Sequence, residues 1–146
     1  IEIPEFLHTG ETTGTEALIA LRDRMLSDPT GRLILSEKPR VTPQTVNVEQ
    51  ILATHPPNTL GYAYAQFMFF MDSDLMRGTP SIRSSRNKAK LEFRPRVRFV
   101  DDPELAYVIT RYREVHDFWH VLSGFETTVE AEIALKWFEF LQTGAY

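Results

Sequence analysis

Apolar residues recur at helical spacing along much of the chain, and the breaks between these periodic stretches predict its helices. The first predicted helix begins at Thr15 and ends at Asp28-Pro29, with apolar positions three and four residues apart between them. A short apolar run at residues 33–35 follows and stops before Pro39. Residues 46–53 then predict a second, short helix. The N-terminal part of the chain is therefore expected to be helical.

A third predicted helix, residues 60–75, is apolar over much of its circumference. Asn58 or Thr59 can cap it. A helix of this kind is usually central in a domain, or it covers an apolar ligand. Core packing is the simpler role for its aromatic and methionine residues. The alternative is a wall for a long apolar ligand, because methionine adapts to irregular shapes. Four residues would then line a lipid tail: Phe67, Met68, Phe70 and Met71.

A long helix is predicted after Asp101-Asp102-Pro103, where one of the acids is the N-cap and proline takes the first helical position. Its apolar face extends through at least four turns to His120. Ser123-Gly124 then breaks the pattern. The histidines of this helix are therefore expected on its inward side.

The last predicted helix begins near Thr127 and continues to Gly144. Thr127 and Glu130 have the spacing of a capping box, in which each satisfies a backbone N–H at the start of the helix. This gives Glu130 a local role and leaves Glu132 free for another.

The fold class predicted by these elements is mainly α: a single-domain antiparallel helical bundle over residues 1–146. Residues 1–14 form an extended N-terminal arm, and residues 78–98 form a long basic loop. The length of 146 residues, with 42% hydrophobic and 25% charged residues, suits one globular domain. No apolar run reaches the eighteen or so residues of a membrane-spanning helix.

Charge is distributed unevenly along the chain. The net charge is −4, yet eight of the sixteen basic residues lie between Arg77 and Arg98, with Glu92 as the one acid among them. A solvated loop is the simplest interpretation, and contact with anionic lipid head groups is the alternative. A nucleic-acid partner is not expected, because the chain is acidic and the basic run lacks interleaved aromatic residues.

Candidate metal ligands gather near the C-terminus, in a chain with four histidines. His116 and His120 are four residues apart, so a helix projects both from one face, with Asp117 beside that face. Eleven residues separate His120 from Glu132, and a turn at Gly124 would bring the last helix back towards the histidines. With no cysteine in the chain, a metal here must be held by nitrogen and oxygen. This ligand set suits zinc, with iron or manganese as alternatives.

Two alternatives compete with a metal site of this design. A lone histidine on an apolar helix face is more often a hydrogen-bonded core residue than a ligand. Here, however, two histidines lie with two acids, Asp117 and Glu132. Burying all four side chains without a cation would leave uncompensated charge, at a cost of roughly several kcal/mol per ion. The pattern also resembles the zinc peptidase motif, but there the acid after the first histidine is a glutamate. Asp117 has a shorter side chain, so a peptidase is the weaker alternative.

Residues 99–108, 111–117, 136–139 and 142–144 closely resemble the Coq4 family of ubiquinone (coenzyme Q) biosynthesis proteins. The family motif HDxxH, eleven residues, then E, falls on His116, Asp117, His120 and Glu132 without a gap. The likeness extends back through residues 21–29 and covers most of the chain. One difference is the loop at residues 78–90, which is longer than the family usually has. A second is that family members continue for several further helices beyond the position of Tyr146, so part of a lipid pocket is expected to lie outside this chain.

The resemblance implies a lyase that depends on zinc or a similar divalent metal, with Asp117 as a fourth ligand or a base. The implied reaction removes the ring C1 carboxylate of a polyprenyl hydroxy-methoxybenzoate, by decarboxylation alone or coupled to hydroxylation. It implies a peripheral protein on the matrix side of the mitochondrial inner membrane, with other ubiquinone biosynthesis proteins as partners in a multi-subunit complex. The alternative is a non-catalytic lipid-binding scaffold that organises this complex.

Overall fold

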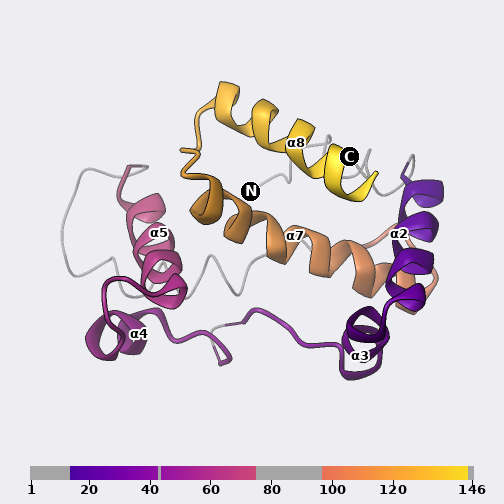
Figure 1. The fold of residues 1–146 in the computed structure, drawn as a ribbon, viewed down its shortest axis with the longest axis horizontal. Helices are drawn as coiled ribbons and strands as arrows, with labels where there is room; N and C mark the ends of the chain where they lie inside the picture. The colour runs from indigo at the N-terminus through magenta and orange to yellow at the C-terminus, as the bar shows by residue number, and fades with distance from the viewer. Residues whose placement is uncertain (1–13, 43, 75–96, 145–146) are drawn as a thin grey trace.

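The computed structural model describes residues 14–42, 44–74 and 97–144, with the side chains of residues 70–74 outside the description. This part of the chain contains six α-helices and no strand, which confirms the mainly α class (Figure 1). The helices are α2 (Thr15–Ser27), α3 (Pro29–Glu37), α4 (Val48–Thr54), α5 (Leu60–Asp74), α7 (Pro103–Ser123) and α8 (Val129–Thr143). The predicted N-terminal arm lies outside the described residues except Gly14, and so does the basic loop except residues 97–98.

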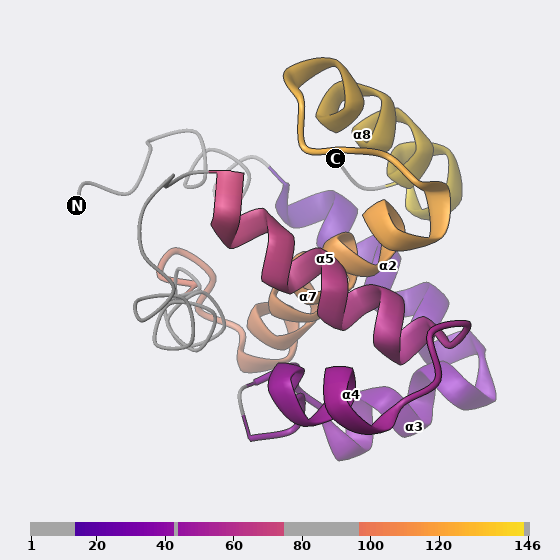
Figure 2. The ribbon, with the colours of Figure 1, turned by 90° about the vertical axis from the view of Figure 1, so that its left-hand side faces the viewer.

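Helix α7 is the central element, and α2, α3 and α5 all pack against it (Figures 1 and 2). It begins as predicted: the side chain of Asp102 accepts hydrogen bonds from the N–H groups of Glu104 and Leu105, and Pro103 occupies the first turn. It ends at Gly124, whose φ of 70° favours glycine.

One apolar cluster joins the first half of α7 to α2 and α3. Its buried members are Leu18, Leu35, Leu105, Tyr107, Val108 and Ile109. Helix α3 was not predicted from the sequence. Asp28-Pro29 ends α2 as predicted but also starts α3, because the Asp28 carboxylate accepts from the N–H groups of Thr30 and Gly31. The run at residues 33–35 is therefore helical.

A second apolar cluster joins the other half of α7 to α4 and α5. Its buried members are Val41, Val48, Tyr64, Ala65 and Met68. The ring of Tyr64 on α5 stacks on Phe118 of α7, with centroids 4.0 Å apart. The N–H of Tyr62 donates to Thr59 Oγ1 at 3.3 Å, which supports the predicted cap of α5. Helix α4 begins two residues later than predicted, with Asn47 as its cap.

Helix α8 runs back along α7 after the turn at Gly124, as the antiparallel prediction requires (Figure 1). The predicted capping box is wrong by one residue. Thr128, not Thr127, is the N-cap, and its hydroxyl accepts from the N–H of Ala131 at 3.3 Å. Glu130 therefore falls one position before the place from which a capping-box glutamate reaches back, and its side chain is exposed. Helix α8 ends at Gly144, as predicted.

Candidate metal centre

Three of the predicted ligands come together between α7 and α8. The Nε2 atoms of His116 and His120 lie 3.1 Å apart. Glu132 Oε2 lies 3.2 Å from Nε2 of His116, and Oε1 lies 3.3 Å from Nε2 of His120. His120 is buried, His116 is mostly buried, and the side chain of Glu132 is 40% exposed. One side of the group is thus closed by protein and the other is open to solvent.

The helix geometry accounts for this convergence. His116 and His120 are one turn apart on α7, on a face that turns towards α8. Glu132 lies in the first turns of α8, where its own N–H donates to the Thr128 carbonyl. The left-handed backbone at Gly124 reverses the chain direction between the two helices. The predicted return of Glu132 to the histidines therefore depends on this turn and on the start of α8.

In each histidine, Nδ1 is the ring nitrogen that faces away from the other candidate ligands, and it lies next to a hydrogen-bond acceptor. His120 Nδ1 lies 3.1 Å from the carbonyl oxygen of Phe125, which can only accept a hydrogen bond. His116 Nδ1 lies 2.9 Å from Glu139 Oε1. These acceptors favour the tautomer with the proton on Nδ1, which presents a lone pair from Nε2. Histidine ligands of metals usually donate their second N–H to an acceptor of this kind.

The donor set fits a divalent cation. With the proton of each histidine on Nδ1, the two Nε2 lone pairs and the Glu132 carboxylate would repel each other unless a positive charge lay between them. Zinc holds histidine nitrogen at about 2.0–2.1 Å, and two tetrahedral ligands at that distance are roughly 3.4 Å apart. The three separations of 3.1–3.3 Å are close to this value. Among the described residues, His116, His120 and Glu132 form the one group whose ligand atoms all lie within 4.8 Å of one another.

Asp117 is not part of this group. It lies on α7, half-buried, one residue beyond His116 and so on a different side of the helix. Its predicted roles as fourth ligand and as catalytic base stay predictions.

Glu139 on α8 is a further residue of the site, and no role for it was predicted from the sequence. Its side chain is fully buried, and one oxygen contacts His116 while the other accepts from Tyr112 and Lys136, each at 2.7 Å. Burial alone would raise the pKa of this carboxyl group, but the hydrogen bonds from His116, Lys136 and Tyr112 outweigh burial and lower the pKa to about 2. Burial and the bond to Glu139 together raise the pKa of Tyr112. A signal for Glu139 was present in the sequence, because it lies seven residues after Glu132 and hence on the same face of α8.

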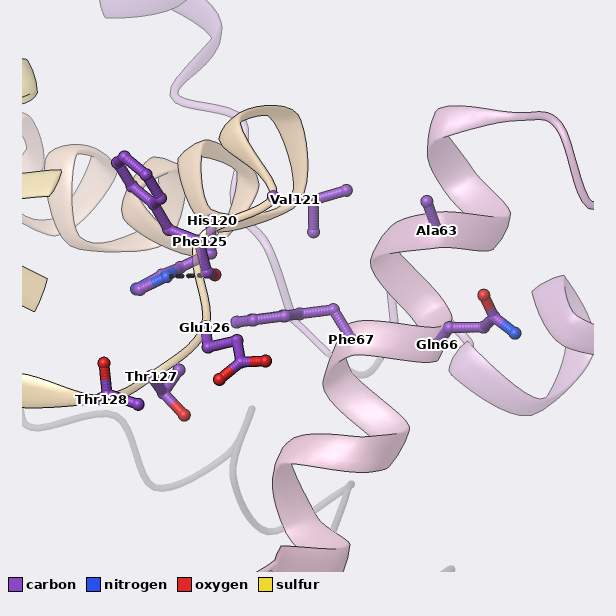
Figure 3. Close-up of a pocket in the computed structure, with 10 residues that line it drawn as sticks. Ala63, Gln66, Phe67, His120, Val121, Phe125, Glu126, Thr127 and Thr128 are labelled. Atoms are coloured by element: carbon purple, nitrogen blue, oxygen red, sulfur yellow. Dashed lines mark hydrogen bonds between the residues drawn. The ribbon is translucent and has the colours of Figure 1, made fainter. Parts of the chain in front are cut away.

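A pocket of about 690 Å³ lies beside His120 (Figure 3). It opens between α5 and the segment that joins α7 to α8, and the ring of Phe67 extends from α5 towards that segment. The rings of Phe67 and His120 stack with centroids 5.4 Å apart. The other lining residues are Ala63, Gln66, Val121, Gly124, Phe125, Glu126, Thr127 and Thr128.

The four residues predicted to line a lipid tail are thus placed differently from one another. Phe67 lines the pocket. Met68 is buried in the cluster with Val41, Val48 and Tyr64, so it belongs to the core. The side chains of Phe70 and Met71 lie outside the described residues. Among the described helices, none has both the length and the apolar character needed to cross a bilayer.

An antiparallel helical domain that directs two imidazole nitrogens and one carboxylate at a common point defines a class, the α-helical proteins with a candidate His-His-Glu metal centre. Within this class the chain belongs to the Coq4 family, because residues 6–145 match the family model described as coenzyme Q (ubiquinone) biosynthesis protein Coq4. This confirms the resemblance noted in the sequence.

Curated relatives support the same assignment. The chain is 48% identical over 135 residues to the mitochondrial ubiquinone biosynthesis protein COQ4 of Uncinocarpus reesii, a match that covers 92% of this chain and 42% of that protein. It is 44% identical to the mitochondrial COQ4 homologues of Danio rerio and Homo sapiens, again over 92% of this chain and 44% of each relative. The chain therefore spans less than half the length of these relatives. No solved structure matches it.

Proposed function

We propose that this chain contains the metal-binding core of a coenzyme Q biosynthesis enzyme that removes the ring C1 carboxylate of a polyprenyl hydroxy-methoxybenzoate. Removal occurs by decarboxylation alone or coupled to hydroxylation, and the coupled form also needs an oxidant such as dioxygen. The observation that carries the proposal is the convergence of His116, His120 and Glu132 beside a pocket. Membership of the Coq4 family supports the pathway.

In this proposal His116, His120 and Glu132 hold one zinc ion, with iron or manganese as alternatives. A bound divalent ion supplies a Lewis acid that can bind a carboxylate or phenolate oxygen of the substrate. The partial exposure of Glu132 supports an open side from which a substrate oxygen could approach. Asp117 is proposed as a fourth ligand or as the group that handles a proton.

The side chains around the pocket have roles that follow from their chemistry. Phe67, Phe125 and Val121 offer apolar surface to the aromatic ring or to the first part of a polyprenyl tail, and excluding water there strengthens electrostatic interactions at the metal centre. Binding of the remote tail can supply energy for orienting the ring. In decarboxylation alone, the electron pair left at ring C1 by loss of CO₂ takes a proton from water, which reaches the exposed side of the centre at Glu132; Asp117 keeps its proposed role as a fourth ligand or a base.

The setting proposed for this activity is the matrix face of the mitochondrial inner membrane. The names of the relatives include the word mitochondrial, which supports the compartment. Peripheral attachment is proposed, with other ubiquinone biosynthesis proteins as partners in a multi-subunit complex.

Metal content of protein purified without a histidine tag tests the site directly. Elemental analysis should find about one zinc per chain in the wild type, because three ligands and one open position hold a single ion. The ion should be lost in His120→Ala. The matched control is His55→Ala, since His55 is exposed and its ring contacts the hydroxyl of Thr54 rather than any candidate ligand. Zinc that persists in His120→Ala, or none in the wild type, would contradict the proposed centre.

Release of CO₂ from a carboxylated ring substrate separates the lyase from the scaffold. The wild-type protein loaded with metal should release CO₂. Glu132→Ala should abolish release while helicity by circular dichroism is unchanged. Lipid binding and partner capture without any CO₂ release would instead favour the scaffold.

A further inference from the structure

The carboxylate of Glu139 is buried and hydrogen-bonded at both oxygens, so its orientation is fixed. Its side chain has no solvent exposure, and each of its oxygens has a separate set of partners. Oε2 accepts from the Tyr112 hydroxyl and the Lys136 ammonium group, each at 2.7 Å. Oε1 is directed at Nδ1 of His116, 2.9 Å away. Because Oε2 is held by two donors, the carboxylate cannot rotate without breaking both bonds.

The carboxylate of Glu139 contacts His116. Of the two histidines in the candidate centre, His116 is the one whose Nδ1 faces a side chain rather than the backbone. His120 is oriented by the carbonyl group of Phe125. For His116 the acceptor is Glu139 Oε1. A neutral imidazole can carry its proton on either nitrogen, and only the form with the proton on Nδ1 presents a lone pair from Nε2. The state of His116 therefore depends on what faces its Nδ1 atom.

Lys136 is the competing neighbour. Its Nζ atom lies 3.3 Å from His116 Nδ1, so it could in principle donate to that nitrogen and favour a proton on Nε2. The same Nζ lies closer to Glu139 Oε2, at 2.7 Å, and this is a charge-assisted bond. The shorter distance from Nδ1 to Glu139 Oε1 also favours the carboxylate as the partner of His116.

We propose that Glu139 is a positioning residue for the metal centre. It holds the proton of His116 on Nδ1 and directs Nε2 at the point shared by His120 and Glu132. Tyr112 and Lys136 act one step further out by fixing the carboxylate. The effect of Glu139 on metal binding rests on the proposed metal site, but the tautomer of His116 can be measured without metal.

The first test is the tautomer of His116 in the metal-free wild-type protein. Long-range ¹H–¹⁵N NMR of the imidazole rings should show the proton on Nδ1 for both His116 and His120. In Glu139→Gln, an isosteric change, the amide NH₂ can face Nδ1 as a donor and should move the His116 proton to Nε2. His120 should keep its tautomer and is an internal control. A wild-type His116 protonated on Nε2 would overturn the inference, whether or not any variant folds.

The second test is metal affinity, measured by zinc competition with a chromophoric chelator. Glu139→Gln should weaken zinc binding about 10- to 100-fold, the usual effect of losing the residue that orients a ligand. Glu130→Gln is the matched control, because it makes the same change on an exposed residue of α8 and should leave affinity unchanged. Equal affinity of the Glu139→Gln and Glu130→Gln proteins would overturn the inference. If wild type binds no zinc, the proposed function fails, while the tautomer measurement still decides the role of Glu139.

Discussion

At the scale of single residues, the stability of the fold depends on fully buried carboxylates that accept hydrogen bonds from specific donors. Glu114 in the middle of α7 is one of them. Its Oε1 accepts from Arg40 Nε at 2.8 Å, and its Oε2 accepts from the N–H of Val41 at 3.1 Å. These bonds attach the segment between α3 and α4 to the central helix. Arg40 itself is 48% exposed, so exposure alone would suggest that it matters little.

Arg40→Ala should lower the free energy of unfolding by about 3 kcal/mol, because it leaves the Glu114 charge buried without a cation. Arg32→Ala is the matched control. Arg32 is exposed and donates to a backbone carbonyl, that of Leu26, so its loss should cost about 0.5 kcal/mol or less. Urea unfolding followed by circular dichroism measures both values. If both variants lost the same free energy of unfolding, the Arg40–Glu114 pair would contribute no more to stability than a surface contact.

The candidate ligands could be predicted from the sequence because their geometry is mostly local. The spacing of His116 and His120 fixes a shared face on any helix, and a glycine turn returns Glu132 to it. For Glu139 the seven-residue spacing from Glu132 indicates the face of α8 but does not identify its partner on α7. Its contact with His116 depends on how α8 is rotated against α7, and that rotation is set by packing. Asp117 shows the opposite case: it is adjacent to His116 in sequence, yet it is not among the three residues whose ligand atoms come together.

At the scale of elements, the corner between α2 and α3 depends on a close backbone approach at a glycine. Gly31 is buried, and a Cβ atom at this position would overlap the carbonyl oxygen of Met25 and lie 2.6 Å from its Cα atom. These are backbone atoms of α2, which cannot move aside as a flexible side chain can. The two helices therefore cross closely enough only because residue 31 has no side chain.

Gly31→Ala should destabilise the protein by about 3 kcal/mol or more, because the corner must open and disturb the cluster around Leu18 and Leu35. Gly61→Ala is the matched control in α5. A Cβ atom there meets nothing closer than 3.5 Å, so helix propensity should make the change neutral or stabilising by up to about 1 kcal/mol. Thermal unfolding compares the two. If Gly31→Ala were as stable as Gly61→Ala, the two helices could not cross as closely as this geometry requires.

The helices themselves were predictable where the apolar pattern was long and the caps were clear, as at Asp102 for α7. Helix α3 is harder to predict because it is short and because Asp28-Pro29 ends α2 at the position where α3 begins. The same pair of residue types starts α7, so the signal was available. The cap of α8 was misplaced because Thr127 and Thr128 are adjacent and both have cap chemistry. Only the backbone of the preceding turn decides between them.

At the scale of the whole molecule, α8 is attached differently from the other helices. Helices α2, α3 and α5 meet α7 through two apolar clusters. On α8 only Leu135 and Glu139 are buried, while Trp137 is 64% exposed and Leu141 is 75% exposed. Apolar burial therefore contributes less to holding α8. The described contacts between α7 and α8 include the candidate metal centre, the Glu139 network and the ring contact of Trp119 with Phe138.

Metal removal should therefore loosen α8 before the rest of the domain. An ion held by His116, His120 and Glu132 ties the two helices together, and at a concentration 100 times its dissociation constant it stabilises the bound state by about 2.7 kcal/mol. Amide hydrogen exchange in α8 should accordingly become up to about 100-fold faster after chelation, while amides in α2 change little. Glu132→Gln should give the same pattern without chelator, which controls for effects of the chelator itself. If exchange in α8 is equally slow with and without metal, Leu135 and the Glu139 network hold the helix by themselves, and the centre does not link the two helices.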